Sequence, residues 1–444
     1  THMKKRLLSL LLAALMLCGA LSGCGAIDAL SPLLDDPSSS EPATGSGSTL
    51  DTLTQERYFT DCWRADTDFA DMYAEADLDY FRSLGDELLS VASGSPDSDS
   101  FDDAAFYFID EYYYICTAHD LANLRYYRDP SDQEALAAMN QAYADRGEAD
   151  GIFWDIMHQV ALTDSYDLLA DYCGESQAQV FSAYDPDASS DSSLRNRETE
   201  LVNKYYSLSA SPEPDFDACA DVFVELVNVR REIAAAAGND SYADYAYYQT
   251  YSRNYTPEDS RSVWAAVKDY FVPIRTELKA MLQDNYAKLM ESGIEVSSQD
   301  ALDALGTVAH SPEAAKAYDY LVEHGLCDNE LLSTKAGVNF TSTLYWYNEP
   351  YIFLTPDGSY YDYSGIIHEF GHFLNSYAVP SDLIFGAADY EICEMQSIGM
   401  EFMATHWYEE LFGPDTARML LLDSFFNSII NVMDGAMFDE FLQR

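Results

Sequence analysis

Apolar and polar residues follow a helical period over most of the chain. From Thr54 to about Lys335, apolar residues recur three and four positions apart, which places them on one face of an α-helix. Acidic, serine-rich breaks at 93–99 and 185–193 predict surface loops. The period predicts helices near 54–93, 101–123, 131–145, 155–173, 197–208, 215–237, 241–251, 257–291 and 311–323.

The pattern changes between residues 338 and 354. Aromatic and β-branched residues concentrate in 338–347 and again in 351–354, and both segments predict strands. Asp357-Gly358 predicts a turn before the next helix. One of these strands could present an open edge to an extended peptide, which would pair with it through main-chain hydrogen bonds. An ordinary core strand is the alternative.

The next helical segment begins near Tyr361 and carries His368-Glu-Phe-Gly-His372. Pro380 limits its extent. The residues beside the two histidines form an apolar face at helical spacing, which predicts that most of this helix is buried. The members of this face are Ile366, Ile367, Phe370, Phe373 and Leu374.

Two histidines four residues apart lie on the same face of a helix, so His368 and His372 can bind one metal ion. Glu369 is placed to take a proton from a water molecule beside the metal without binding the metal itself. Two exposed, unrelated histidines are the alternative, but the buried character of the flanks opposes it, because buried polar side chains need partners. The motif predicts catalytic zinc with three protein ligands and one open position.

A third ligand is expected on a following helix, which Asp389 can cap and Gly413-Pro414 can end. Glu391 and Glu394 lie three residues apart on one face of that helix, and the residues alone leave the choice open. Glu391 is also explained as a favourable charge near the helix N-terminus. Glu401 is predicted to accept a hydrogen bond that orients a ligand histidine. A solvated surface glutamate is the alternative for Glu401.

The net charge of the chain is −52, from 76 acidic and 24 basic residues. Such an excess of negative charge argues against nucleic acid or an anionic lipid surface as a partner. A weaker inference is a preference for cationic or neutral peptides. The cysteines that follow residue 24 are widely spaced and contain no Cys-x-x-Cys pair, so neither a zinc finger nor a disulfide pairing is predicted.

The first residues predict export. Lys4-Lys5-Arg6 precedes an apolar run, 7–21, that is too short to span a membrane with ease and is typical of a secretory signal. Leu21-Ser-Gly-Cys24 is similar to the lipobox of bacterial lipoproteins, which implies cleavage before Cys24 and acylation of its thiol. An ordinary signal peptide is the alternative. Ser, Pro, Gly, Thr and acidic residues then fill a stretch that cannot form a core and predicts a flexible tether.

These patterns divide the chain into a signal peptide (1–23), a lipidated cysteine with its tether (24–53), a helical lobe (54–335) and a catalytic zinc-binding region (336–444). We expect a bacterial lipoprotein at the cell surface or facing the periplasm, with a lipid as its sole attachment to the membrane. Because the helical pattern continues through Phe438, Phe441 and Leu442, we also expect the natural chain to continue past Arg444.

Three blocks resemble the thimet oligopeptidase and oligoendopeptidase F family of zinc metallopeptidases. The first is the helical stretch 223–234, followed by Ser241–Tyr245 and Pro257-Glu258. The second, Asn348–Ile352, is similar to the family's strand before the zinc helix. The third is HEFGH at 368–372 with 394–401, similar to the family's E-x-x-S-x-x-x-E block. The resemblance covers about 215–444.

By position, the resemblance implies that His368, His372 and Glu394 are zinc ligands and that Glu369 is the general base. It implies peptide contacts at Asn348 and Tyr351. It also implies a mainly α fold with two lobes, a small β-sheet beside the zinc helix and a deep channel for short peptides. The expected function is zinc-dependent endopeptidase activity, and the alternatives are a non-catalytic peptide-binding lipoprotein on the same scaffold or another zinc peptidase class.

The sequence departs from the family in two places. Asn375 stands where the family often has a histidine, which leaves the ligands unaffected. The family also carries tyrosine and histidine residues that steady the tetrahedral intermediate, and these lie further along the chain than Arg444. Removing such donors costs about 100–1000-fold in rate. We therefore expect reduced activity from the 444 residues alone.

Overall fold

A computed structural model describes residues 75–184, 192–209, 215–251, 253, 255–291, 293–378 and 390–443. The predicted signal peptide, the lipidated Cys24 and the tether lie outside the described residues, as do Pro380 and Asp389. In the part of the chain that is described, no helix is long and apolar enough to cross a membrane.

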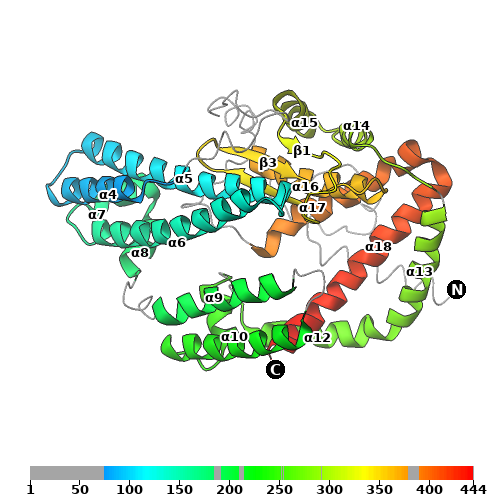
Figure 1. Cartoon of the computed structure of the whole chain (residues 1–444), viewed down its shortest axis with the longest axis horizontal. Helices are drawn as coiled ribbons and strands as arrows, with labels where there is room; N and C mark the ends of the chain where they lie inside the picture. The colour runs from blue at the N-terminus through cyan, green and yellow to red at the C-terminus, as the bar shows by residue number, and fades with distance from the viewer. Residues whose placement is uncertain are drawn as a thin grey trace, which may run out of the picture. The chain divides into compact units, whose positions relative to one another are not determined.

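The described chain is mainly α-helical with one small sheet, which confirms the predicted fold class (Figure 1). The predicted channel between two lobes stays a prediction. The elements are α4 (Leu78–Ser93), α5 (Ser98–Arg128), α6 (Gln133–Ala161), α7 (Tyr166–Cys173), α8 (Glu175–Ala183), α9 (Ser192–Ser209), α10 (Phe216–Ala236), α11 (Tyr242–Gln249), α12 (Pro257–Tyr270), the 3-10 turn η3 (Val272–Ile274), α13 (Arg275–Glu291), α14 (Ser298–Val308), α15 (Pro312–His324), β1 (Cys327–Asp328), β2 (Phe340–Leu344), β3 (Glu349–Phe353), α16 (Tyr361–Ala378), α17 (Tyr390–Ala404), the 3-10 turn η4 (Thr405–Trp407) and α18 (Tyr408–Leu442).

Local sequence explains many of the helix boundaries. Aspartates cap several N-termini: Asp97, for example, accepts a hydrogen bond from the backbone N–H of Ser100 at the start of α5. Ser297 and Asp300 form a reciprocal capping box at the start of α14. Gly325 ends α15 in the left-handed region, at φ 63°, where glycine carries no Cβ penalty.

Several predicted helices differ from the structure. α8 and α14 were not predicted, and the predicted helix 257–291 is divided into α12 and α13 by η3. The predicted segment 131–145 and the first part of 155–173 belong to one long helix, α6, which continues through Gly147 and Gly151, whereas the rest of 155–173 forms α7. The helix after the motif ends earlier than the predicted end at Gly413-Pro414. α17 stops at Ala404, and Gly413 instead kinks α18 at φ 75°.

The chain divides into two compact units. One unit contains α4–α13 and the part of α18 that begins at Asp415. In it, α4, α5 and α6 lie side by side (Figure 1) around stacked aromatic rings, with Phe81 and Phe108 centroids 4.7 Å apart and Tyr112 and Phe153 centroids 4.4 Å apart. A second core in this unit joins α12 and α13 to α18 through Val267, Leu278, Phe426, Ile429 and Met433.

The other unit contains the sheet together with α14–α17. Its strand order is β1-β3-β2, with β1 parallel and β2 antiparallel to β3. β2 and β3 confirm the two predicted strands, whereas the two-residue β1 was not predicted. α16 packs against β2 and β3, and α14 and α15 pack against α16. The unit therefore begins near Ile294, upstream of the boundary predicted near residue 335.

Candidate metal centre

Helix α16 is held in place by hydrogen bonds at its first turn and by its buried apolar face. Asp362 accepts hydrogen bonds from the backbone N–H groups of Asp357 and Gly358, which fixes the preceding turn on the helix. The apolar face predicted from the sequence is buried, with Ile366, Phe370 and Phe373 in the core. The opposite face leaves the imidazoles of His368 and His372 partly exposed, on the side where a ligand can reach them.

Gly371 brings α17 into contact with α16. A Cβ at residue 371 would lie 2.5 Å from the carbonyl oxygen of Gln396 and 2.6 Å from Cα of Ser397. Real Cβ atoms do not approach backbone so closely, so glycine is required at this crossing. One turn before Ser397, α17 carries Glu394 next to the two histidines.

The donor atoms of His368, His372 and Glu394 all lie within 4.8 Å of one another. Oε2 of Glu394 is 3.4 Å from Nε2 of His368 and 3.7 Å from Nε2 of His372. These distances exceed the roughly 2.7–3.2 Å of ordinary N–H···O bonds. They approach the spacing of about 3.3–3.6 Å between ligands of one tetrahedral ion, and two imidazoles with one carboxylate are a donor set typical of zinc. The residues therefore fit the predicted metal.

Hydrogen bonds with neighbouring side chains fix two of these three ligands. Nδ1 of His368 lies 2.7 Å from Oε1 of Glu401, which leaves Nε2 facing the other donors. The buried hydroxyl of Ser397 donates to Oε2 of Glu394 at 2.7 Å. Burial lowers the pKa of His368, but the hydrogen bond and charge of Glu401, together with the charges of Glu369 and Glu394, outweigh it, so the pKa lies above its ordinary value.

Glu369 is 5% exposed and contacts a neighbouring strand. Thr341 of β2 donates its hydroxyl to Oε2 of Glu369, over 2.8 Å, and lies 2.9 Å from the backbone carbonyl oxygen of the same residue. Burial raises the pKa of the Glu369 carboxyl, and the hydrogen bond from Thr341 opposes this rise. A buried carboxylate beside a metal-ligand set is suited to accept and return a proton.

The two predicted peptide contacts lie in the hairpin between β2 and β3. Asn348 occupies the turn at φ 51°, a left-handed conformation that asparagine tolerates well, and its N–H donates to the carbonyl of Tyr345. Tyr351 lies in the central strand and is 2% exposed. Both positions have a structural explanation, and their contact with a peptide stays a prediction.

Sequence reasoning did not assign a role to Ser397, Thr341 or Gly371. Ser397 stands inside the glutamate block, where a hydroxyl one turn after a ligand could have been noticed. The contact of Thr341 depends on how β2 packs against α16, and no local signal announces it. The side chain of Glu391 lies outside the described part of the chain.

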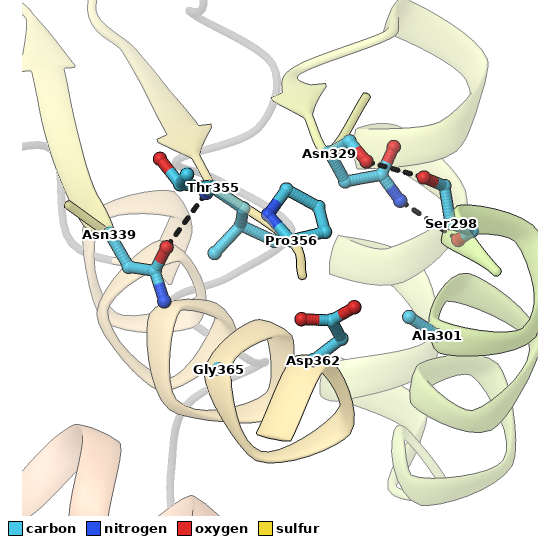
Figure 2. A pocket seen from close by; sticks show the side chains of 9 residues that line it. Ser298, Ala301, Asn329, Asn339, Thr355, Pro356, Asp362 and Gly365 are labelled. Carbon is cyan, nitrogen blue, oxygen red and sulfur yellow. Dashed lines mark hydrogen bonds between the residues drawn. The ribbon is translucent and has the colours of Figure 1, made fainter. Parts of the chain in front are cut away.

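A small pocket lies at the N-terminal end of α16 (Figure 2). Its volume is about 10 Å³, the space of one water molecule. Figure 2 shows the carboxylate of Asp362 beside Pro356 and facing the side of α14 that carries Ser298 and Ala301. None of the donor residues lines this pocket, so it is separate from the candidate metal centre.

Comparison with known proteins finds similarity in structure and not in sequence. No protein-family model and no curated protein matches the chain. A crystal structure assigned to oligoendopeptidase F from Bacillus anthracis superposes with a TM-score of 0.66 at 18% identity, covering 80% of this chain and 76% of that one. A second structure assigned to oligoendopeptidase F gives 0.65 at 19% identity, covering 83% and 75%. PZ peptidase A, solved with an inhibitor, gives 0.65 at 18% identity, with the same coverage. The chain therefore has the fold of these peptidase structures.

Proposed function

We propose that this protein is a zinc-dependent endopeptidase that hydrolyses short peptides. The observation that carries the proposal is the convergence of three donor atoms, from His368, His372 and Glu394, with the carboxylate of Glu369 on the same helix. The fold shared with peptidase structures supports it. A chain that only binds peptides has no need for a buried glutamate between two ligand histidines.

His368, His372 and Glu394 would hold the metal. Zinc bound there would supply Lewis-acid chemistry, polarising a peptide carbonyl and lowering the pKa of a water molecule. Glu369 accepts a proton from the attacking water and afterwards returns it to the leaving amine. Glu401 holds the imidazole of His368 in one orientation, and Ser397 does the same for the carboxylate of Glu394.

The peptide would lie along β2. Among the described strands, β2 pairs with β3 alone and is an edge of the described sheet, and an edge strand is the kind of strand to which an extended peptide adds by main-chain hydrogen bonds. Most of β2 is half-buried, as expected for an edge strand beside a site. The strongly negative charge of the chain favours cationic or neutral peptides and disfavours nucleic acid. We also propose that the natural protein is exported and anchored by a lipid on Cys24.

The test is hydrolysis of a library of peptides blocked at both ends, with added zinc, with a chelator, and with Glu369→Gln. We expect internal cleavage that the chelator abolishes. Glu369→Gln should lower kcat by about 100–10,000-fold, the usual contribution of a general base, while zinc still binds. Glu409→Gln, at an exposed glutamate in the same unit, is the matched control and should leave kcat unchanged.

Two outcomes would contradict the proposal. A chain that binds one zinc ion and cleaves none of the peptides would favour the peptide-binding alternative, which peptide titration of Glu369→Gln and wild type would then examine directly. Cleavage that survives chelation and the loss of Glu369 would exclude the metal mechanism. Cleavage of blocked peptides excludes a carboxypeptidase, because that class needs a free C-terminus.

A further inference from the structure

Thr341 joins the edge strand β2 to the carboxylate of Glu369 through its hydroxyl. It lies within the β2–β3 pairing, opposite Ile352, where the register of the sheet fixes its backbone. Ile352 is fully buried. The position of the Thr341 hydroxyl is therefore set by the sheet, while the group that it contacts belongs to helix α16.

Both contacts of the hydroxyl are made to the same residue. Oγ1 of Thr341 is 2.8 Å from Oε2 of Glu369 and 2.9 Å from its backbone carbonyl oxygen. A side-chain atom that touches both ends of one glutamate restricts the rotations that connect them. The ionised oxygen is the stronger acceptor of the two, because hydrogen bonds to charged groups are shorter and stronger. The carbonyl also has its usual partner one turn along the helix.

Position matters for a proton acceptor. A general base must lie within hydrogen-bond reach of the proton that it removes. Misplacement of a reacting group by 1 Å costs as much as about 100-fold in rate. Glutamate has three rotatable side-chain bonds, and packing alone leaves its terminal oxygens free to turn. Oε2 is the oxygen that Thr341 restrains.

We propose that Thr341 is a positioning residue that sets the carboxylate of Glu369 relative to the strand along which the peptide lies. This inference rests on the proposed function. A peptide paired with β2 would be aligned by the backbone of that strand, and Thr341 extends the same alignment to the proton acceptor. One residue would then connect the register of the substrate to the geometry of the reaction.

A positioning role and a merely structural role for the Thr341 hydroxyl predict different results for substitutions, so an experiment can distinguish them. Thr341→Val keeps the branched shape and removes the hydrogen bond, whereas Thr341→Ser keeps the hydroxyl and removes the methyl group. Thr405→Val is the matched control. Its hydroxyl donates to a helix carbonyl, that of Phe402, at 2.7 Å, in the same unit and without reaching the metal centre.

The experiment measures kcat and KM on one end-blocked peptide, zinc affinity by competition with a chelator, and the midpoint of thermal unfolding. Thr341→Val should lower kcat by about 10–100-fold with KM within twofold of wild type, because the lost interaction acts mainly in the transition state. Thr341→Ser should recover most of kcat. Zinc affinity should be unchanged in both variants, and Thr405→Val should match wild type in kcat.

The inference is overturned if Thr341→Val retains kcat within twofold. It is also overturned if the loss is not recovered by serine and is accompanied by weaker zinc binding or a lower unfolding midpoint, which would identify a structural role. Absence of hydrolysis by the wild-type chain, with zinc bound, would sink the proposed function itself and the positioning role with it.

Discussion

Two groups of charged side chains lie in the same unit and differ in how their charges are satisfied. One is the pair formed by Lys335 and Asp328, whose side chains are 0% and 3% exposed. The ammonium of Lys335 has three donors, and all three are used, on Oδ1 of Asp328 at 2.7 Å and on the carbonyls of Leu354 and Asp328 at 2.8 and 3.3 Å. The ring of Phe353 covers it, with its centroid 4.8 Å away.

The other group is the candidate metal centre. Its three donor side chains are partly exposed, with Glu394 at 55%. Hydrogen bonds with Glu401, Ser397 and Thr341 hold His368, Glu394 and Glu369, respectively. The donor atoms of the three ligands converge at distances too long for good hydrogen bonds between them. The hydrogen bonds of Lys335 are thus all made within the protein, whereas the lone pairs of the three ligand atoms in the metal centre point toward one common position.

This difference separates a structural cluster from a binding one. Burial alone does not mark function, because Lys335 is more buried than any donor of the metal centre. Perturbed surroundings do not mark function either, since structural ion pairs produce them too. The mark is a set of acceptors that point at one place which solvent can reach. Substitutions in either group test this difference.

The largest effect on stability should come from breaking the buried pair of Lys335 and Asp328. Lys335→Met leaves Asp328 buried without its ammonium partner, and loss of one member of a buried pair costs about 3–5 kcal/mol. The measurement is the free energy of local opening, from hydrogen exchange of the amides of β1 and β3 as a function of urea. Zinc affinity in the fraction that stays folded should be close to that of wild type.

The double variant Lys335→Met/Asp328→Asn is the control for this interpretation. Removing both charges avoids an unpaired buried carboxylate, so the double variant should recover part of the loss. If Lys335→Met cost less than about 1 kcal/mol, as an exposed pair does, the cluster would not stabilise the sheet as described.

An intermediate effect is expected where the two helices of the metal centre cross. Gly371→Ala places a Cβ against the backbone of Gln396 and Ser397, so α17 must shift. Such overpacking costs about 1–3 kcal/mol. Because Glu394 moves with α17, zinc affinity should fall together with stability. Chelator competition and hydrogen exchange of α17 measure the two effects.

Gly399→Ala is the matched control, on α17 itself. Nothing lies within 4 Å of a Cβ at residue 399, and alanine favours helix by about 0.5–1 kcal/mol relative to glycine. This variant should be as stable as wild type or more stable, with normal zinc affinity. Equal behaviour of the two alanine variants would show that the close crossing at Gly371 is not required.

The sequence supports the metal centre unevenly. His368, Glu369 and His372 follow from spacing on one helix, because a helix fixes which of its residues share a face. The same argument narrows the third ligand to Glu391 or Glu394, and only the family resemblance favours Glu394. Thr341 could not be predicted, since its contact with a helix 28 residues away depends on the packing of β2 against α16.

The fold shows the same limit. Most long segments with a strong helical period were predicted, and the two aromatic strands were found, whereas α8, α14 and the break between α12 and α13 were missed. β1 was missed because two residues carry no periodicity, and it forms through its pairing with β3. The unit that contains the metal centre extends upstream to α14 because α14 packs on α16, and this contact between distant segments has no local signature.

The smallest effect should come from Glu401, which acts on the metal centre through His368. Glu401→Gln keeps an oxygen that can accept the hydrogen bond of Nδ1 and removes the negative charge. Loss of such a partner weakens metal affinity by about 10–100-fold, and we expect the lower end because the hydrogen bond survives. The affinity is best compared at pH 8, where protons compete little for the imidazoles.

The metal-free protein provides an independent reading of the same interaction. Burial lowers the pKa of His368 and Glu401 raises it, with a net rise. Removing the charge of Glu401 leaves burial less opposed, so the pKa of His368 must fall, as an NMR titration of labelled histidine would measure. Glu409→Gln should leave it in place. A pKa of His368 that stays the same or rises in Glu401→Gln would mean that Glu401 does not act on His368. Glu401 would then not be one of the side chains that hold the ligands of the metal centre in place.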